Sequence, residues 1–190
     1  MKNSWPSSLY LVLLHHPVKN KNGETIASAV TNLDLHDLSR LVKTYGAAGL
    51  YVLTPLTDQQ VLAGRIIAHW QTGQGSVYNP KRREALNLVK VCGGLGEATE
   101  DISRREPGRS VKSVATCASF KREAVSFASM RQRMESEAAA FVLLLGTAWG
   151  LSDELIAGAD AVLAPIQGAS GYNHLSVRAA AAIILDRLLG

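Results

Sequence analysis

The stretch Phe141-Val-Leu-Leu-Leu-Gly-Thr-Ala-Trp-Gly150 decides the fold of this chain. It begins with an uninterrupted apolar run, which is typical of a strand buried on both faces of a parallel sheet. A glycine follows, and glycine lets the backbone turn sharply and approach other groups closely. Other apolar runs of β type occur at 9–14, 49–53, 88–92, 112–116 and 161–165. Longer helical patterns separate these runs, so we expect an α/β fold with a mostly parallel sheet and helices on both faces.

The clearest helical pattern follows Asp34. Apolar side chains at 35, 38, 41, 42 and 45 share one face of a helix that ends at Gly46, and Asp34 is a candidate N-cap. We expect further helices at 58–70, from residue 80 onward, at 120–137 and at 174–189.

Length and composition favour a single domain over residues 1–190, which would bury about 70% of the surface of its unfolded chain. The hydrophobic share of 47% excludes a disordered protein. No apolar run approaches the ~20 residues that cross a bilayer, and there is no signal-peptide pattern. We therefore expect a cytoplasmic protein without a membrane partner. Cys92 and Cys117 provide neither a disulfide framework nor the spacing of a metal site. The net charge of +4 permits a polyanionic partner without requiring one.

Three loops are candidates for a ligand site, because ligands of open α/β sheets bind beyond the carboxyl ends of the strands. They follow the runs at 112–116, 141–145 and 161–165. Together they would form a pocket for a nucleoside-sized ligand, although glycines also follow strands in α/β proteins for structural reasons alone. No phosphate-binding pattern of the form G-x-x-x-x-G-K-[ST] or G-x-G-x-x-G is present, and no G-x-S-x-G nucleophile pattern is present.

Charged residues form three further groups. Asp34, His36, Asp37 and Arg40 recur at helical spacing and would be either a functional group or an ordinary solvated helix start. The basic clusters Lys81-Arg82-Arg83 and Arg104-Arg105 would either bind phosphates or remain solvated. Cys117 with His174 as its base is a candidate nucleophile, but a free cysteine is more often a small buried hydrophobe.

Two C-terminal motifs resemble those of the SPOUT methyltransferases, which modify RNA with S-adenosylmethionine. The first is the strand and glycine loop at 141–154, and the second is Leu175-Ser-Val with the alanine-rich helix that follows. Arg40, followed six residues later by Gly46 and then a strand, is similar to the Asn-x-Gly-x-x-x-Arg segment of the 2′-O-methylating branch. Segments 14–18, 31–37 and 78–80 resemble one bacterial SPOUT group, whose members sometimes occur fused to a tRNA guanine-N1 methyltransferase domain.

This resemblance implies a C-terminal trefoil knot, a homodimer with active sites at the subunit interface, and a methyl-donor pocket built from the three loops. The residues that it places at the S-adenosylmethionine pocket are Thr116, Cys117, Gly146, Thr147, Gly150, Ile166, Gly168, Asn173, Leu175 and Ser176. The sequence departs from the family pattern on the acceptor side, with Asp34 in place of Asn and His36 in place of Gly. The loop after 141–145 lacks the Glu often found there and carries Trp149, and His174 stands in place of Asn.

The expected function is methyl transfer to a ribose 2′-oxygen or base nitrogen of tRNA or rRNA. Arg40 is the first candidate catalytic residue, because a guanidinium orients phosphate or stabilises developing negative charge. Asp34, Asp37 and Asp153 are the candidate carboxylate bases, and His36 is a candidate proton shuttle. Lys81, Arg82, Arg83, Arg104 and Arg105 are the expected RNA contacts. The alternatives are a non-catalytic RNA-binding or regulatory protein on the same scaffold, and a hydrolase that uses Cys117 and His174.

Overall fold

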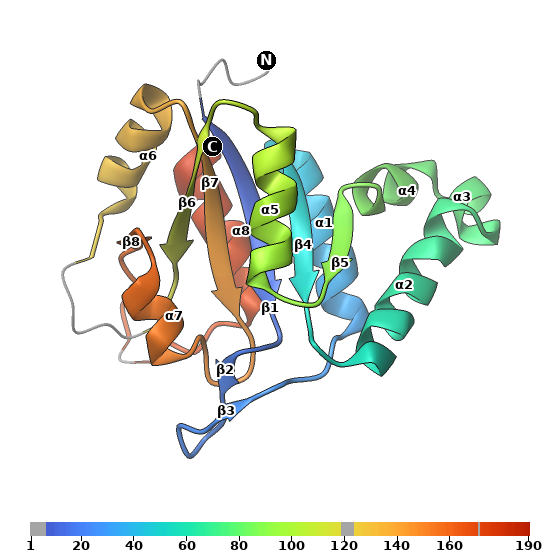
Figure 1. Cartoon of the computed structure of the whole chain (residues 1–190), viewed down its shortest axis with the longest axis horizontal. Helices are drawn as coiled ribbons and strands as arrows, with labels where there is room; N and C mark the ends of the chain where they lie inside the picture. The colour runs from blue at the N-terminus through green and yellow to red at the C-terminus, as the bar shows by residue number, and fades with distance from the viewer. Residues whose placement is uncertain (1–6, 119–123, 171) are drawn as a thin grey trace.

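A parallel sheet organises the computed structural model, which describes residues 7–118, 124–170 and 172–190. Its strand order is β5-β4-β1-β7-β6-β8, and every strand pair in it is parallel. The strands are β1 (Ser8–Leu14), β4 (Gly49–Leu53), β5 (Val89–Cys92), β6 (Ser110–Ala115), β7 (Ala139–Gly146) and β8 (Ala161–Val162). A small antiparallel hairpin of β2 (Val18–Lys19) and β3 (Thr25–Ile26) projects beyond the carboxyl ends of the central strands (Figure 1). The expected α/β fold with a mostly parallel sheet is confirmed.

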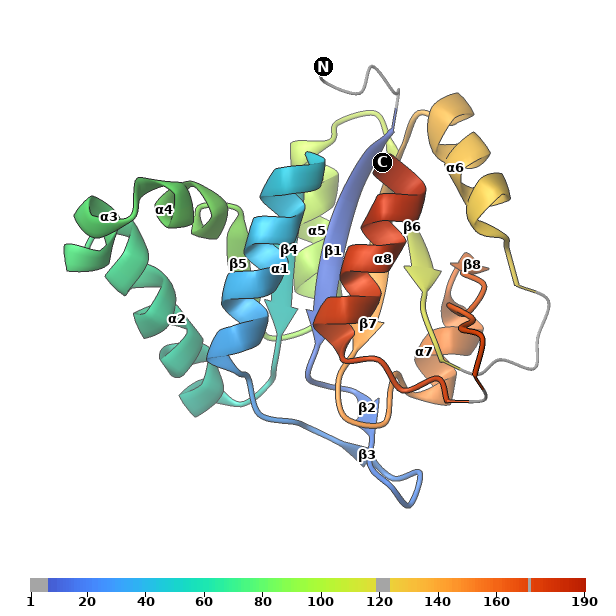
Figure 2. The ribbon, with the colours of Figure 1, turned by 180° about the vertical axis from the view of Figure 1, so that it is seen from behind.

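Helices cover both faces of the sheet. Helices α1 (Asn32–Tyr45) and α8 (Val177–Leu189) lie side by side on one face (Figure 2), and α6 (Phe127–Ser136) packs next to α8. The other face carries α5 (Leu95–Arg105) and α7 (Asp153–Gly158), as Figure 1 shows. Beside the β5 edge lie α2 (Thr57–Gln71), α3 (Gln74–Tyr78) and α4 (Pro80–Leu86).

The central strands β1, β4 and β7 are almost entirely apolar because both of their faces are buried. Leu11 and Leu13 of β1 pack into the core beneath α1 and α8, while Val12 and Leu14 pack into the core on the α5 side. This alternation follows from the two-residue period of a strand. Strand β7 pairs with β1 along its whole length, with Leu143 opposite Leu11. The unbroken apolar runs in the sequence therefore correctly predicted that these strands are buried on both faces.

Several expected helix boundaries were wrong. The helix predicted at 120–137 begins only at Phe127, where Ser126 caps it, and Val125 is extended and bonds to Val162. Residues 120–123 lie outside the described part of the chain. The last helix begins at Val177 rather than at residue 174, because the Ser176 side chain accepts a hydrogen bond from the Ala179 amide. The last strand ends at Val162, well before residue 165.

Helix α1 is capped by Thr31 and not by Asp34. Thr31 is the N-cap, and its hydroxyl oxygen accepts from the Asp34 amide at 3.2 Å. The same hydroxyl donates to the Asp34 carboxylate at 2.6 Å. This reciprocal arrangement satisfies a free amide of the first turn and fixes the Asp34 side chain. The prediction that Asp34 caps the helix was therefore wrong by three residues, since Thr31 is the N-cap.

Within the described ranges, none of the helices combines the length and the apolar character needed to cross a membrane.

Candidate functional site

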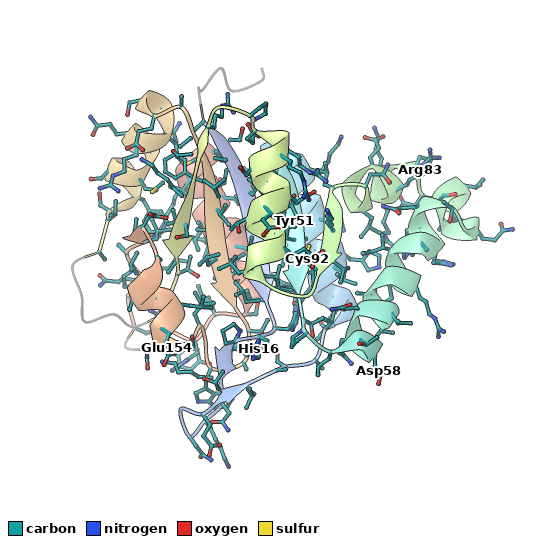
Figure 3. The ribbon with its side chains drawn as sticks, in the orientation of Figure 1. His16, Tyr51, Asp58, Arg83, Cys92 and Glu154 are labelled. Carbon is teal, nitrogen blue, oxygen red and sulfur yellow. The ribbon has the colours of Figure 1, made fainter. Side chains whose placement is uncertain are left out.

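The three loops singled out in the sequence lie at one edge of the sheet. Because the strands are parallel, the carboxyl ends of β6, β7 and β8 point the same way, toward the bottom of Figure 1. His16 and Glu154 mark this edge in Figure 3. Two of the loops are joined directly, since the Asn173 side-chain amide donates to the Ala118 carbonyl at 2.6 Å. All the expected donor-pocket residues lie in these loops, at strand β7's last residue or at the cap of α8.

The loop after β7 folds back on its own strand. Ala148 and Gly150 have positive φ values of 50° and 100°, and the Gly150 amide donates to the Thr147 carbonyl at 2.9 Å. A Cβ atom added to Gly146 would lie 2.6 Å from the Leu151 backbone nitrogen. The loop therefore needs glycine at 146, where the backbone of residues 150 and 151 leaves no room for a side chain.

The β2–β3 hairpin holds this loop in place. The Trp149 amide donates to the Lys19 carbonyl at 3.0 Å, and the Lys19 amide donates to the Gly150 carbonyl at 2.9 Å. The Lys19 ammonium also pairs with the Asp153 carboxylate at 2.8 Å. The Trp149 side chain remains 67% exposed beside this edge. It is therefore available to a ligand and is not a core anchor.

A chain of hydrogen bonds connects β1 to the same loop. The His15 Nδ1 atom lies 3.0 Å from the Ser28 hydroxyl, which in turn bonds to the Thr147 hydroxyl. Thr147 also donates to the Leu14 carbonyl at 3.0 Å. The Thr147 hydroxyl is therefore committed to the framework, and only the backbone at Thr147 remains for a ligand.

His15 should make the protein less stable in mild acid. Burial lowers the pKa of this fully buried imidazole, and the nearby Asp34 carboxylate only partly opposes the shift. Below about pH 6.5 the unfolded chain then binds more protons than the folded chain, so the free energy of unfolding falls by up to about 1.4 kcal/mol per pH unit. Thermal unfolding should show a lower Tm at about pH 5.5 than at about pH 7.5, before the carboxylates begin to titrate near pH 4.

His15→Gln should reduce this pH dependence, and the lowered pKa of His36 should account for part of what remains. His16→Gln should leave it unchanged, because His16 is the exposed neighbour. An unchanged pH dependence of Tm in His15→Gln would contradict the assignment.

Cys117 does not have the setting of a reactive thiol. It is half-buried, and burial raises its pKa. A thiol with a raised pKa is protonated near neutral pH and is a poor nucleophile. His174, its expected base, is exposed and packs against Tyr172 with ring centroids 5.3 Å apart. This setting argues against the hydrolase hypothesis.

The carboxylates of α1 bind an arginine that the sequence analysis did not single out. Arg178, in the first turn of α8, contacts Asp34 at 2.8 Å and Asp37 at 3.1 Å. The Asp34 side chain is only 6% exposed and the Asp37 side chain 47% exposed. Asp37 was expected to neighbour Arg40, but its ion pair instead joins α1 to the start of α8. The one available signal was the position of Arg178 directly after the Leu175-Ser-Val motif.

Arg40 is exposed and borders two surface hollows. The larger, of about 390 Å³, runs between α1 and α8 and is lined by Asp37, Leu41, Thr44, Arg178 and Ala179 besides Arg40. The smaller, of about 190 Å³, is lined by Arg40, Asn79, Lys81 and Arg82. The structure thus brings Arg40 together with part of the Lys81–Arg83 cluster, from which it is separated by some 40 residues of sequence.

His36 lies close enough to Arg40 and Arg82, which line the smaller hollow, to feel their charges; we call this smaller hollow the basic hollow. Its ring meets the edge of the Trp70 ring with centroids 5.5 Å apart. Burial, followed by the charge of Arg82, lowers the pKa of His36. The imidazole is therefore neutral near pH 7, which is the form that accepts a proton.

The two basic clusters occupy separate places. Arg83 projects from α4 beside the β5 edge (Figure 3), whereas Arg104 and Arg105 lie at the end of α5 on the other face of the sheet. Arg104 and Arg105 both bind Asp101, at 3.3 and 2.9 Å. Lys90 and the Tyr51 hydroxyl also bind this carboxylate and hold its pKa well below the usual range. Arg104 and Arg105 thus do not extend the surface around Arg40, and their contact with RNA stays a prediction.

A metal site was not expected from the sequence. In the parts of the chain described above, no three His, Cys, Asp or Glu side chains are grouped so that they could hold a metal ion.

Comparison with known sequences identifies the family. A family model described as SAM-dependent RNA methyltransferase matches residues 8–190. A tRNA (guanine-N(1)-)-methyltransferase of Nitratidesulfovibrio vulgaris is 46% identical over 183 residues, which cover 96% of this chain and 42% of that protein. An uncharacterised protein of Aquifex aeolicus is 35% identical over 181 residues, which cover 95% of this chain and 88% of that protein. The chain thus spans less than half the length of the first relative.

Solved structures show the same fold at low identity. The SpoU methyltransferase AviRb from Streptomyces viridochromogenes, solved with AdoMet, matches with a TM-score of 0.54 and 20% identity over 96% of this chain and 57% of its own. The TrmH/SpoU tRNA modifying enzyme of A. aeolicus matches with a TM-score of 0.56 and 16% identity over 99% of this chain and 76% of its own. The fold is that of the SPOUT methyltransferases, and the chain belongs to the family of SAM-dependent RNA methyltransferases.

Proposed function

We propose that this chain transfers a methyl group from S-adenosylmethionine to a ribose 2′-oxygen or a base nitrogen of tRNA or rRNA. The observation that carries the proposal is the Arg178 bridge. Arg178 follows the Leu175-Ser-Val motif of the expected donor pocket and pairs with Asp34 and Asp37 on the helix that bears Arg40. The hollow between α1 and α8 is therefore lined by two kinds of residue. Some belong to the start of α8, next to the expected methyl-donor pocket, and the others belong to α1, which is expected to act on the methyl acceptor.

The carboxyl-edge loops fit S-adenosylmethionine. Gly146 has no room for a Cβ atom, so at this position the loop after β7 offers only backbone to a ligand. The loops are neutral and partly apolar, which suits the adenosine and the aliphatic part of the methionine chain. The residues that would hold the cofactor are Thr116, Cys117, Gly146, Thr147, Gly150, Ile166, Gly168, Asn173, Leu175 and Ser176. When bound, the cofactor supplies an electrophilic methyl group on a sulfonium.

The residues of α1 would act on the acceptor. Arg40 orients an RNA phosphate or stabilises negative charge that develops on the acceptor atom. Neutral His36 and the half-exposed Asp37 are the groups that would receive the acceptor proton. Asp34 is nearly buried and bound by both Thr31 and Arg178, so its role would be to position Arg178. This assignment replaces Asp34 as a candidate base.

The relatives support tRNA as a substrate class and do not identify the methylated atom. The N. vulgaris relative is a tRNA (guanine-N(1)-)-methyltransferase, but this chain covers 42% of it. The named activity would therefore belong to another part of that protein if the chain corresponds to a fused second domain. A tRNA-modifying enzyme works in the cytoplasm, where we place this chain.

We also propose that the chain works as a homodimer and that its C-terminal segment forms a trefoil knot. Both features are what the resemblance to the SPOUT methyltransferases implies. Apolar side chains exposed at the starts of α1 and α2 support a contact with a second copy. They are Leu33, Leu56, Val61 and Leu62, which are 43–59% exposed.

The test is methyl transfer from isotopically labelled S-adenosylmethionine to total RNA, followed by mass spectrometry of the nucleosides. Calorimetry should show cofactor binding, and light scattering should give twice the monomer mass of 20.4 kDa. A labelled nucleoside from tRNA or rRNA is the expected result. Cofactor binding without transfer to any RNA would favour the regulatory alternative. No binding at millimolar cofactor would overturn the proposal.

A further inference from the structure

We propose that the small hollow between α1 and α4 is a binding site for a phosphate of the RNA backbone, with Arg82 as its preorganised donor. The hollow is lined by Arg40, Asn79, Lys81 and Arg82 and measures about 190 Å³. That volume is below the roughly 300 Å³ of typical small-molecule pockets, so it suits a single anionic group rather than a whole nucleoside. The inference rests on the proposed function, because it takes RNA as the substrate and names the segment that grips it.

Trp70 holds the Arg82 guanidinium in position. The guanidinium carbon lies 4.3 Å from the centroid of the Trp70 ring. A guanidinium stacked on an aromatic face keeps its N–H donors free in the plane of the group, where they match the oxygens of a phosphate. Trp70 belongs to α2, so packing between two helices fixes the donor before any ligand arrives.

The two guanidinium groups at the hollow, those of Arg40 and Arg82, lack acidic partners in the described part of the chain. Among the described residues, no carboxylate lies within salt-bridge distance of Arg82 or Arg40, and the buried Arg82 Nε atom has no hydrogen-bond partner. Lys81 pairs only with Glu84, at 3.3 Å on an exposed surface. Unpaired cations at a shared hollow repel one another, and an anion would remove both the repulsion and the unmet donor.

Asn79 adds a neutral donor to this set. Its side-chain oxygen caps α4 by accepting from the Arg82 amide at 3.1 Å. The cap orients the side chain, and the remaining amide nitrogen is a donor only. The same hydrogen bond fixes the Asn79 side chain, which lines the hollow, to the backbone of Arg82.

The positive field of the hollow extends to His36. Arg82 and Arg40 both act to lower the pKa of His36, after burial as the first cause, while Asp37 opposes them. A phosphate bound in the hollow would weaken this effect. The charges of the proposed site therefore act on His36, one of the residues expected to receive the proton of the methyl acceptor.

An exposed aromatic residue favours RNA over a free anion. Tyr78 directly precedes Asn79, and its side chain is 88% exposed. An aromatic face beside a phosphate-binding group is the usual arrangement for single-stranded nucleic acid, in which a base stacks and its phosphate is bound. The hollow therefore suits a backbone phosphate, and Tyr78 is the candidate stacking surface for a neighbouring base.

The test compares RNA binding by Arg82→Ala, Arg82→Lys and Trp70→Leu, measured by fluorescence anisotropy at several salt concentrations without cofactor. Loss of one phosphate contact should weaken binding about tenfold and reduce the salt slope by about one ion in Arg82→Ala. Arg82→Lys keeps the charge but not the planar stack, so an intermediate loss is expected. Trp70→Leu should weaken binding although it removes no charge. Arg133→Gln, on exposed α6 at the opposite end of the sheet, is the matched charge control and should bind RNA normally.

Unchanged RNA affinity and salt slope in both Arg82→Ala and Trp70→Leu would overturn the site. Saturable binding of inorganic phosphate that Arg82→Ala removes, with RNA binding unaffected, would also overturn it in favour of a free-anion site. Circular dichroism of Arg82→Lys checks that the fold is intact. Arg82-dependent RNA binding in a chain that methylates no RNA would leave this inference standing and reject the proposed function.

Discussion

Replacing Arg40 by alanine should lower methyl transfer at least about 100-fold, as removal of a group that stabilises transition-state charge does in other enzymes. The affinity for S-adenosylmethionine should stay within about twofold of the wild-type value, because Arg40 lies on α1 and not in the loops at the carboxyl edge. Arg40 borders both the α1–α8 hollow and the basic hollow, so it is placed to act on RNA from either side. Single-turnover methylation and calorimetry on the same samples measure the two effects separately.

Two variants make this test specific. Arg40→Lys keeps the positive charge and loses the two-pronged guanidinium, so partial activity is expected. Lys43→Ala removes a positive charge from the same helix, three residues away and outside both hollows, and should leave turnover unchanged. Wild-type turnover in Arg40→Ala would remove Arg40 from the mechanism.

The sequence predicted those parts of the fold that depend on local burial. The run Phe141–Leu145 is apolar because both faces of β7 are covered, and this can be read without knowing what covers them. Helix α5 was not predicted, because its buried face is not marked by apolar residues alone. Its buried face includes Asp101, which interrupts the apolar stripe and is tolerated only because Lys90 and Arg105 neutralise it.

The candidate site could be predicted only in pieces. Arg40 and the Lys81–Arg83 cluster were each visible in the sequence, but their meeting at one hollow depends on how α4 packs against α1. The Arg178–Asp34 pair joins residues 144 positions apart, and no periodicity relates them. Trp70 was not singled out at all, because its role depends on Arg82 lying over its ring.

Gly146→Ala should lower the affinity for S-adenosylmethionine at least about tenfold and destabilise the protein by about 1–3 kcal/mol, as overpacking usually does. The atoms that the new methyl group would meet are backbone atoms, the Leu151 nitrogen at 2.6 Å and the Gly150 carbonyl carbon at 2.8 Å. Unlike the end of a flexible side chain, they cannot rotate away. The whole turn must shift, and with it the backbone that is expected to line the donor pocket.

The matched control is Gly158→Ala, at the end of α7 close to the same edge of the sheet. A Cβ atom at 158 meets nothing within 4 Å, and the residue does not have a positive φ. This variant should bind the cofactor normally and be as stable as the wild type or slightly more so, because alanine restricts the unfolded chain. Calorimetry well below the Tm of each variant separates loss of binding from loss of folding. The turn is hydrogen-bonded to the hairpin through Lys19. If Gly146→Ala binds the cofactor like the wild type, then either the hairpin moves together with the turn, or the donor pocket does not use this loop.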